Sequence, residues 1–183
     1  MVAILTAAHH GFELTSGVGL VWQPELGLGA SGVFWGAQIP IWLTLAVKGD
    51  RRWDRVLAAL SGTALAGVCV HFLIWPWRRN RLGLPALTEA EGLAPTVLPA
   101  YNALLHLWGV ACALSIAREV QPGARRWSLL GLAALPLLRR SAQHHFSWLI
   151  EEAARNPAWW NRGVLQGHPG GPTTSECAAL GAV

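Results

Sequence analysis

The residues best suited to acid–base chemistry lie near the start of the chain, in the stretch AAHHGFEL. His9 and His10 precede Glu13 by four and three residues. If this stretch is helical, that spacing places both imidazoles beside the carboxylate on neighbouring turns. Such a group can share a proton, hold a metal ion or neutralise its own charge. Glu13 is therefore the first candidate acid or base, with His9 and His10 as the groups that tune it and relay its proton.

Further polar residues interrupt apolar stretches later in the chain. His71 is one, and His106 is another, with Asn102 one helical turn before it. Counted from the expected helix ends, Glu13, His71, His106 and Arg140 all lie about 17 to 22 Å into the membrane. An ionisable residue at such a depth is a functional-site hypothesis by default, because a charge there costs about 2.5 to 3.5 kcal/mol.

This shared depth predicts a polar layer between the helices. In it, His106 would relay a proton, and Arg140 would stabilise negative charge or pair with Glu13. The alternative is structural, since a histidine inside a membrane helix can also hydrogen-bond a neighbouring helix.

Tryptophan is unusually frequent, with 11 residues. Most lie at or near the ends of apolar segments, where indole rings anchor helices at the lipid headgroups. Trp35 and Trp42 lie inside a segment, seven residues apart and hence on one helix face. They can line a pocket, or they can pack against lipid. The residues expected to line a substrate pocket are Trp35, Trp42, Trp108, Asn102, His71 and His144.

No sequence motif requires a cofactor. The chain contains no HExxH, HxxEH or paired ExxH signature, so the sequence assigns no metal ligand. His71 and His106 are conceivable axial ligands of a haem. P-loop, GxGxxG and GxSxG motifs are also missing from the sequence. The arginines lie in short clusters at segment ends, where membrane topology explains them, so nucleic-acid binding is not expected.

Composition indicates a membrane protein. The chain is 52% hydrophobic and 13% charged, against about 25% charged in soluble domains. Three uncharged runs each exceed the roughly 18 residues that mark a transmembrane candidate. Bare backbone finds no hydrogen bonds in lipid, so these runs are expected to be helices. The runs are Leu26 to Val47, Val56 to Trp77 and Val97 to Ala117.

We therefore expect an all-α integral membrane protein, a bundle of about five transmembrane helices, with four to six as the range. Residues 1–162 form a single transmembrane domain, and residues 163–183 form a disordered tail rich in Gly and Pro, in which His168 is incidental. The expected spans are 1–22, 27–47, 55–77, 97–118 and, least regular, 127–150.

The last segment is amphipathic and can lie partly in the membrane interface. Pro136 can break its helix. Beyond it, one face is apolar and the opposite face is polar, so the polar face turns either to water or inward to Glu13. The apolar face comprises Ala142, Phe146, Leu149, Ile150 and Ala153, and the polar face Arg140, His144, Ser147, Glu151 and Arg155.

The basic residues predict how the protein is oriented in the membrane, and the glycines predict where helices can associate. Seven loop cations fall on the side of the N-terminus and three on the other, which favours a cytoplasmic N-terminus. Arginine as almost the sole basic residue, with abundant Ala, Gly and Leu, suggests a bacterial cytoplasmic membrane. Gly29, Gly32 and Gly36 form a stripe on which another helix can pack, within the chain or in an oligomer.

Two classes of function fit these residues. The first is a membrane-embedded enzyme that applies buried Glu and His acid–base chemistry to a lipophilic substrate, an isoprenoid or a lipid. The second is a non-catalytic membrane component: an accessory subunit, a small transporter, or a haem- or metal-binding protein. The lipid bilayer is the expected partner in both.

Overall fold

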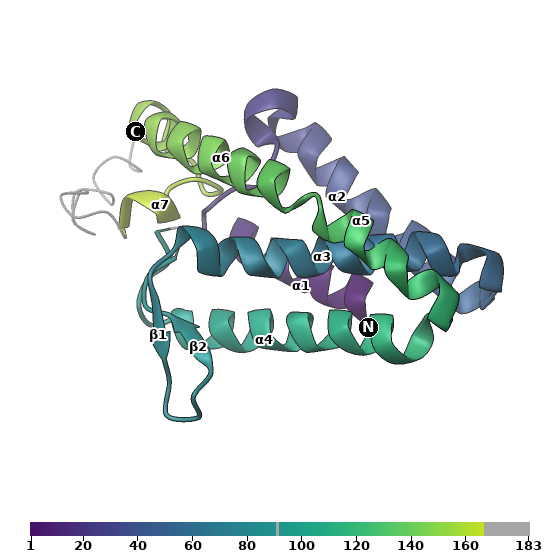
Figure 1. The fold of residues 1–183 in the computed structure, drawn as a ribbon. Coiled ribbons are helices and arrows are strands. Elements are labelled where there is room, and N and C mark those ends of the chain that lie inside the picture. The colour runs from purple at the N-terminus through teal and green to yellow at the C-terminus, as the bar shows by residue number, and fades with distance from the viewer. Residues whose placement is uncertain (91, 167–183) are drawn as a thin grey trace.

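The computed structural model describes residues 1–90 and 92–166, which are mostly helical (Figure 1). The helices are α1 Val2–Thr15, α2 Gln23–Lys48, α3 Asp54–Ile74, α4 Leu98–Leu114, α5 Ser128–Leu132, α6 Leu135–Arg155 and α7 Gly163–Gln166. Short 3₁₀ or π turns are η1 Arg51–Trp53, η2 Ser115–Glu119 and η3 Pro122–Trp127. Two short strands, β1 Trp77–Arg79 and β2 Pro85–Leu87, pair antiparallel.

Helix α3 occupies the middle of the bundle and packs against α4, α5 and α6. Helices α3 and α4 lie side by side along most of their length, and α1 packs on α4 behind them (Figure 1). Helices α2 and α6 cover the other side of α3. The short N-terminal helix is thus enclosed by longer ones, and the residues of its inward face meet α3 and α4.

Three helices in the described part of the chain are long and apolar enough to cross a membrane. They are Gln23–Lys48, Arg51–Ile74 and Leu98–Glu119. Large apolar side chains point outward from them: Val33 on α2 is 71% exposed and Leu107 on α4 is 60% exposed. Since water would disfavour so much exposed apolar surface, these faces suit lipid. An integral membrane protein is therefore supported.

The two other expected spans are shorter helices than the sequence pattern suggested. Helix α1 has 14 residues, about 21 Å of helix, and stops before Gly17, whose φ of +75° favours glycine. The fifth segment is divided into α5 and α6, and Pro136 lies in the first turn of α6, where proline is tolerated. Five full spans are thus not seen among the described residues.

Helix α1 has an unusual inward face, because that face carries the polar residues. Thr6, His9, His10 and Glu13 are buried, whereas Ile4 is 54% exposed. A soluble amphipathic helix has the opposite arrangement. An apolar exterior and a polar interior are consistent with a helix surrounded by protein inside a membrane bundle.

The closest approach of helices occurs where α5 crosses α3, and not at the predicted glycine stripe. A Cβ on Gly62 would meet the backbone of Ser128, and a Cβ on Gly131 would meet the carbonyl oxygen of Ala59. At Gly29, Gly32 and Gly36, by contrast, a Cβ would meet nothing within 4 Å. The expected packing of a helix of this chain on that stripe is therefore wrong. Its use in an oligomer stays a prediction.

Replacing Gly131 by alanine is expected to destabilise the bundle, because the new methyl group overlaps the α3 backbone, which cannot move independently. Overpacking of this kind costs about 1–3 kcal/mol. The matched control is Gly36→Ala, which adds the same methyl group to open space in a helix and should leave the protein as stable or slightly more so. Thermal unfolding in detergent measures both, and equal unfolding temperatures would contradict the assigned contact.

Helix α6 turns its polar face away from Glu13. Its apolar residues Ala142, Phe146, Leu149 and Ala153 are buried against the bundle. The opposite residues, Arg140, His144, Ser147, Glu151 and Arg155, are all exposed. The predicted amphipathic helix is therefore present, and the alternative in which its charges turn inward is wrong.

The long loop after α3 contains the β1–β2 hairpin. Asn102 of α4 holds β2: its Oδ1 accepts from the Leu87 N–H at 2.7 Å and its Nδ2 donates to the Leu87 carbonyl at 3.0 Å. At the other end of the chain, α7 lies within the residues predicted as a tail. Residues 167–183, with His168, lie outside the described residues.

Candidate functional site

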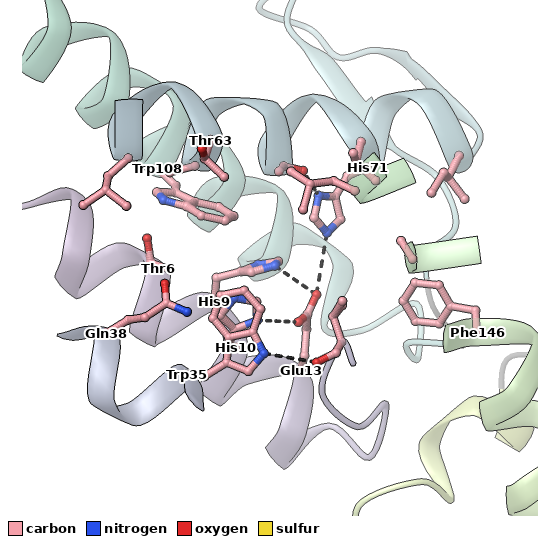
Figure 2. A pocket seen from close by; sticks show the side chains of 18 of the residues that line it. Thr6, His9, His10, Glu13, Trp35, Gln38, Thr63, His71, Trp108 and Phe146 are labelled. Atoms are coloured by element: carbon pink, nitrogen blue, oxygen red, sulfur yellow. Dashed lines mark hydrogen bonds and ion pairs between the residues drawn. The ribbon is translucent and has the colours of Figure 1, made fainter. Parts of the chain in front are cut away.

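The candidate site is centred on the carboxylate of Glu13, which four side chains from three helices surround. Figure 2 shows the three histidines among them. On α1 itself, His9 Nε2 lies 3.0 Å from Oε1 and His10 Nδ1 lies 3.3 Å from Oε2. From α3, His71 Nε2 lies 3.6 Å from Oε1. From α4, the Tyr101 hydroxyl donates a hydrogen bond of 2.9 Å to Oε1. Both carboxylate oxygens are therefore engaged.

The orientation of His71 is determined by its own helix. Its Nδ1 lies 2.8 Å from the carbonyl oxygen of Gly67, one turn earlier. A carbonyl oxygen can only accept, so Nδ1 carries the hydrogen. In a neutral His71, Nε2 then presents a lone pair to the Glu13 carboxylate. The Nε2 lone pair and the carboxylate oxygen are both electron-rich, so they repel each other unless a proton or a cation lies between them.

Aromatic rings fix His9 in the centre of the group. The His9 ring stacks on Trp108, at 4.6 Å between centroids, and on Tyr101, at 5.6 Å. Tyr101 is 0% exposed and His9 is 2% exposed. Because neither ring can turn freely in such packing, His9 Nε2 remains directed at Glu13.

Sequence reasoning missed Tyr101. Tyr101, Leu105 and Trp108 are spaced four and seven residues apart, which places them on one helix face. All three are buried. That face was the available signal, although the sequence does not say that it meets Glu13.

The carboxylate lies in the wall of an apolar cavity of about 110 Å³. Helices α1, α2, α3, α4 and α6 all contribute to the lining. Its polar groups belong mainly to α1, with Gln38, Thr63 and His71 from α2 and α3, and Phe146 closes the end towards α6 (Figure 2). Reactive groups thus gather beside a space that favours apolar molecules.

The three interior tryptophans predicted as pocket-lining residues all line this cavity. Trp35 lies against His10, with 3.8 Å between ring centroids, and its Nε1 donates to the carbonyl of Val21 at 3.2 Å. Trp42 and Trp108 are buried beside the same space. A second cavity of about 170 Å³ lies between α1 and α2 and shares His10, Trp35 and Trp42 with the first.

Four other predicted residues lie away from the cavity, as the described residues define it. Asn102 binds the hairpin backbone. His106 is half-buried against Phe72. Arg140 is exposed on α6, and His144, also exposed, lies 3.5 Å from Glu25. The predicted polar layer thus brings Glu13 and His71 together but not His106 or Arg140.

His145 is a buried histidine that the sequence analysis did not single out. It lies on α6, outside the three candidate spans, and is 1% exposed. Its Nε2 donates to the carbonyl oxygen of Val18 at 3.1 Å. Burial lowers the pKa of His145 below its ordinary value, although the hydrogen bond to Val18 and the charges of Glu13 and Glu25 oppose this effect. His145 therefore ties α6 to the loop after α1 as a neutral side chain.

The lowered pKa of His145 predicts a pH dependence of stability. Above pH 6.5 the histidine is neutral in the folded and unfolded states, so its contribution is complete. Below pH 6.5 the unfolded chain binds a proton that the folded chain resists, so stability falls as the pH falls. His145→Gln should reduce this loss between pH 7.5 and 5.5, measured by thermal unfolding. His144→Gln is the exposed control, and an equal reduction in both variants would contradict the assignment.

The cluster has the composition of a proton-sharing group or of a metal centre. Ligand atoms of His9, His10 and Glu13 lie within 4.8 Å of one another. One buried carboxylate has three imidazoles around it, so a single added proton balances the charge, and it can pass between several nitrogens. The cluster can therefore take up or release a proton beside the cavity. In comparison with known proteins, no family model, curated protein or solved structure matches this chain.

Proposed function

We propose that this protein is a membrane-embedded enzyme that acts on a lipophilic, isoprenoid-like or lipid-like substrate. One observation carries the proposal: a Glu–His–Tyr cluster, in which both carboxylate oxygens of Glu13 have partners, opens onto a cavity whose other walls are mostly apolar. Buried ionisable groups are costly inside a membrane bundle, and the five that converge here from three helices exceed what helix association needs.

The geometry supports distinct roles for the members of the cluster. Glu13 accepts hydrogen bonds from several donors at once, so it serves best as the fixed anion that orients the imidazoles. His9, His10 and His71 all line the cavity and contact this anion, so they can exchange a proton with a bound substrate. Tyr101 holds the carboxylate in place and acts as a positioning residue.

The tryptophans should make the cavity prefer apolar substrates that carry or develop a positive charge. Trp35, Trp42 and Trp108 line the space next to the cluster. Their π faces attract positive charge, so they can stabilise a carbocation or an ammonium group close to Glu13. A substrate on which positive charge develops during protonation fits this arrangement.

We place the route of entry along α2. This helix is the most exposed of the candidate spans, since only 11% of its most apolar 18-residue stretch is buried. It departs from helical geometry at Gly27, and the second cavity separates it from α1. A lipid-dissolved molecule can approach from the bilayer past such a loosely packed helix. The proposal includes a bacterial cytoplasmic membrane with the N-terminus on the cytoplasmic side.

The proposal is tested by comparing lipid extracts of host cells that produce the wild-type chain, Glu13→Gln or the exposed-site control His144→Ala. Untargeted mass spectrometry should find a lipophilic compound that is depleted, and a product that accumulates, with the wild type and His144→Ala but not with Glu13→Gln. Identical extracts from all three strains, with equal protein levels, would favour the non-catalytic class instead.

A further inference from the structure

We infer that the Glu13 cluster binds one divalent first-row transition metal ion, of the Zn²⁺ type, with His9, His10 and Glu13 as ligands and His71 as a fourth. The sequence contains no established metal motif, so the inference depends on how the fold assembles these residues. It deepens the proposed function by naming an ion at the same site. It relies on that function only for what the ion does there.

The first argument is the spacing of the donor atoms. The distances from Glu13 oxygens to His9 Nε2, His10 Nδ1 and His71 Nε2 are 3.0, 3.3 and 3.6 Å. Around a tetrahedral Zn²⁺ with bonds of about 2.0–2.2 Å, neighbouring ligand atoms lie roughly 3.3–3.5 Å apart. Each imidazole nitrogen is thus already at about the separation from a Glu13 oxygen that a shared ion would impose. Ligand atoms of His9, His10 and Glu13 also lie within 4.8 Å of one another, so these three residues define the site and His71 would join them as the outermost ligand.

The second argument is the direction of the donor atoms. The hydrogen bond from His71 Nδ1 to the Gly67 carbonyl leaves the Nε2 lone pair directed at Glu13. A backbone carbonyl in this position is the usual outer partner of a metal-binding histidine, because it fixes the tautomer and the ring plane. Tyr101 holds the carboxylate in the same way, by a hydrogen bond at 2.9 Å. His71 and Glu13 therefore each have an outer partner.

The third argument is electrostatic. Without a cation, three imidazoles and one carboxylate in an apolar wall require a bound proton for neutrality. A divalent ion takes the place of that proton, cancels the charge of Glu13 and leaves a net positive charge beside the cavity. Nitrogen-rich sites with one carboxylate suit Zn²⁺, Fe²⁺ and Co²⁺ rather than Mg²⁺ or Ca²⁺. Since four protein ligands complete a tetrahedral shell, a polar group of the substrate would approach from the cavity as a fifth ligand.

The test uses the full chain purified in detergent. Its metal content is measured by mass spectrometry. The protein is then stripped with a chelator and titrated with Co²⁺ alone, whose visible absorption reports nitrogen and oxygen coordination. We expect about one ion per chain, displaced by Zn²⁺. His10→Ala and His71→Ala should each weaken binding at least about tenfold. The matched control His144→Ala removes an exposed histidine and should bind as the wild type does.

Zn²⁺ should also raise the unfolding temperature of the wild-type chain, because an ion that binds only the folded state stabilises it. The shift in unfolding temperature and the wild-type Co²⁺ titration test for the bound ion even if a variant fails to fold. A wild type that takes up neither Co²⁺ nor Zn²⁺, or variants that bind as tightly as the wild type, would overturn the inference. Lipid conversion without metal uptake overturns the metal site alone, whereas metal uptake without lipid conversion supports the metal site and overturns the proposed enzyme.

Discussion

Replacing Glu13 by glutamine is expected to lower turnover of the lipophilic substrate by at least about 100-fold, the usual contribution of acid–base groups. Glutamine keeps the shape of the side chain and one oxygen that can accept from Tyr101 and His9. It lacks the negative charge that holds a proton, or a cation, among the imidazoles. The loss should therefore appear in the rate of the reaction rather than in the fold.

The control for this variant is Glu25→Gln. Glu25 is also a carboxylate beside a histidine, 3.5 Å from His144, but both side chains are about half exposed. Its replacement should leave turnover unchanged, since a solvated ion pair contributes little. Thermal unfolding of both variants separates catalysis from stability. If Glu13→Gln is folded and turns over within a few-fold of the wild type, the cluster only links helices and the enzyme proposal is wrong.

The local part of the site could be predicted because it follows from helical spacing alone. His9, His10 and Glu13 are four and three residues apart, and the structure places both imidazoles against the carboxylate. Counting along the apolar segment also predicted that His71 lies at the depth of Glu13. It did not predict which face of its helix His71 occupies. Contacts between residues on one helix need no knowledge of how helices pack.

The contributions of other helices were harder to predict, because depth does not determine direction. His71 and His106 were expected at similar depths, yet one contacts Glu13 and the other lies against Phe72. The face that α4 turns inward carries Tyr101 and Trp108 instead. A single uncharged tyrosine near the start of an apolar segment gives no signal of a buried partner. Only the packing of α1 on α4 shows why a hydroxyl is needed there.

Helix packing itself was misjudged for a related reason. A stripe of small residues shows that a helix can be approached closely, not that another helix does so. The stripe on α2 is open, whereas Gly62 and Gly131, in two different segments, together permit the contact of α3 and α5. The sequence cannot predict such a pair of glycines until the two segments are known to cross. The break between α5 and α6, which brings Gly131 to this crossing, was also only partly signalled by Pro136.

The comparison of His71→Gln with His106→Gln tests the site most directly, because it separates the structural assignment from the sequence expectation. Both are histidines inside candidate spans on neighbouring helices, and the same substitution is made at each. Only His71 lines the cavity and reaches Glu13. His71→Gln should lower turnover by about 100-fold or more, since an amide can carry neither the proton nor the metal ion.

His106→Gln should change turnover by no more than a few-fold, because this side chain lies outside the cavity lining in the described residues. The rate should be measured across a pH series, since a purely structural defect lowers all rates equally, whereas loss of a proton carrier changes the shape of the profile. Equal losses in both variants would show that the whole polar layer acts together, as depth alone suggested. A loss confined to His106→Gln would mean that the substrate binds on the Phe72 side of α4 and that the cavity beside Glu13 is not the active site.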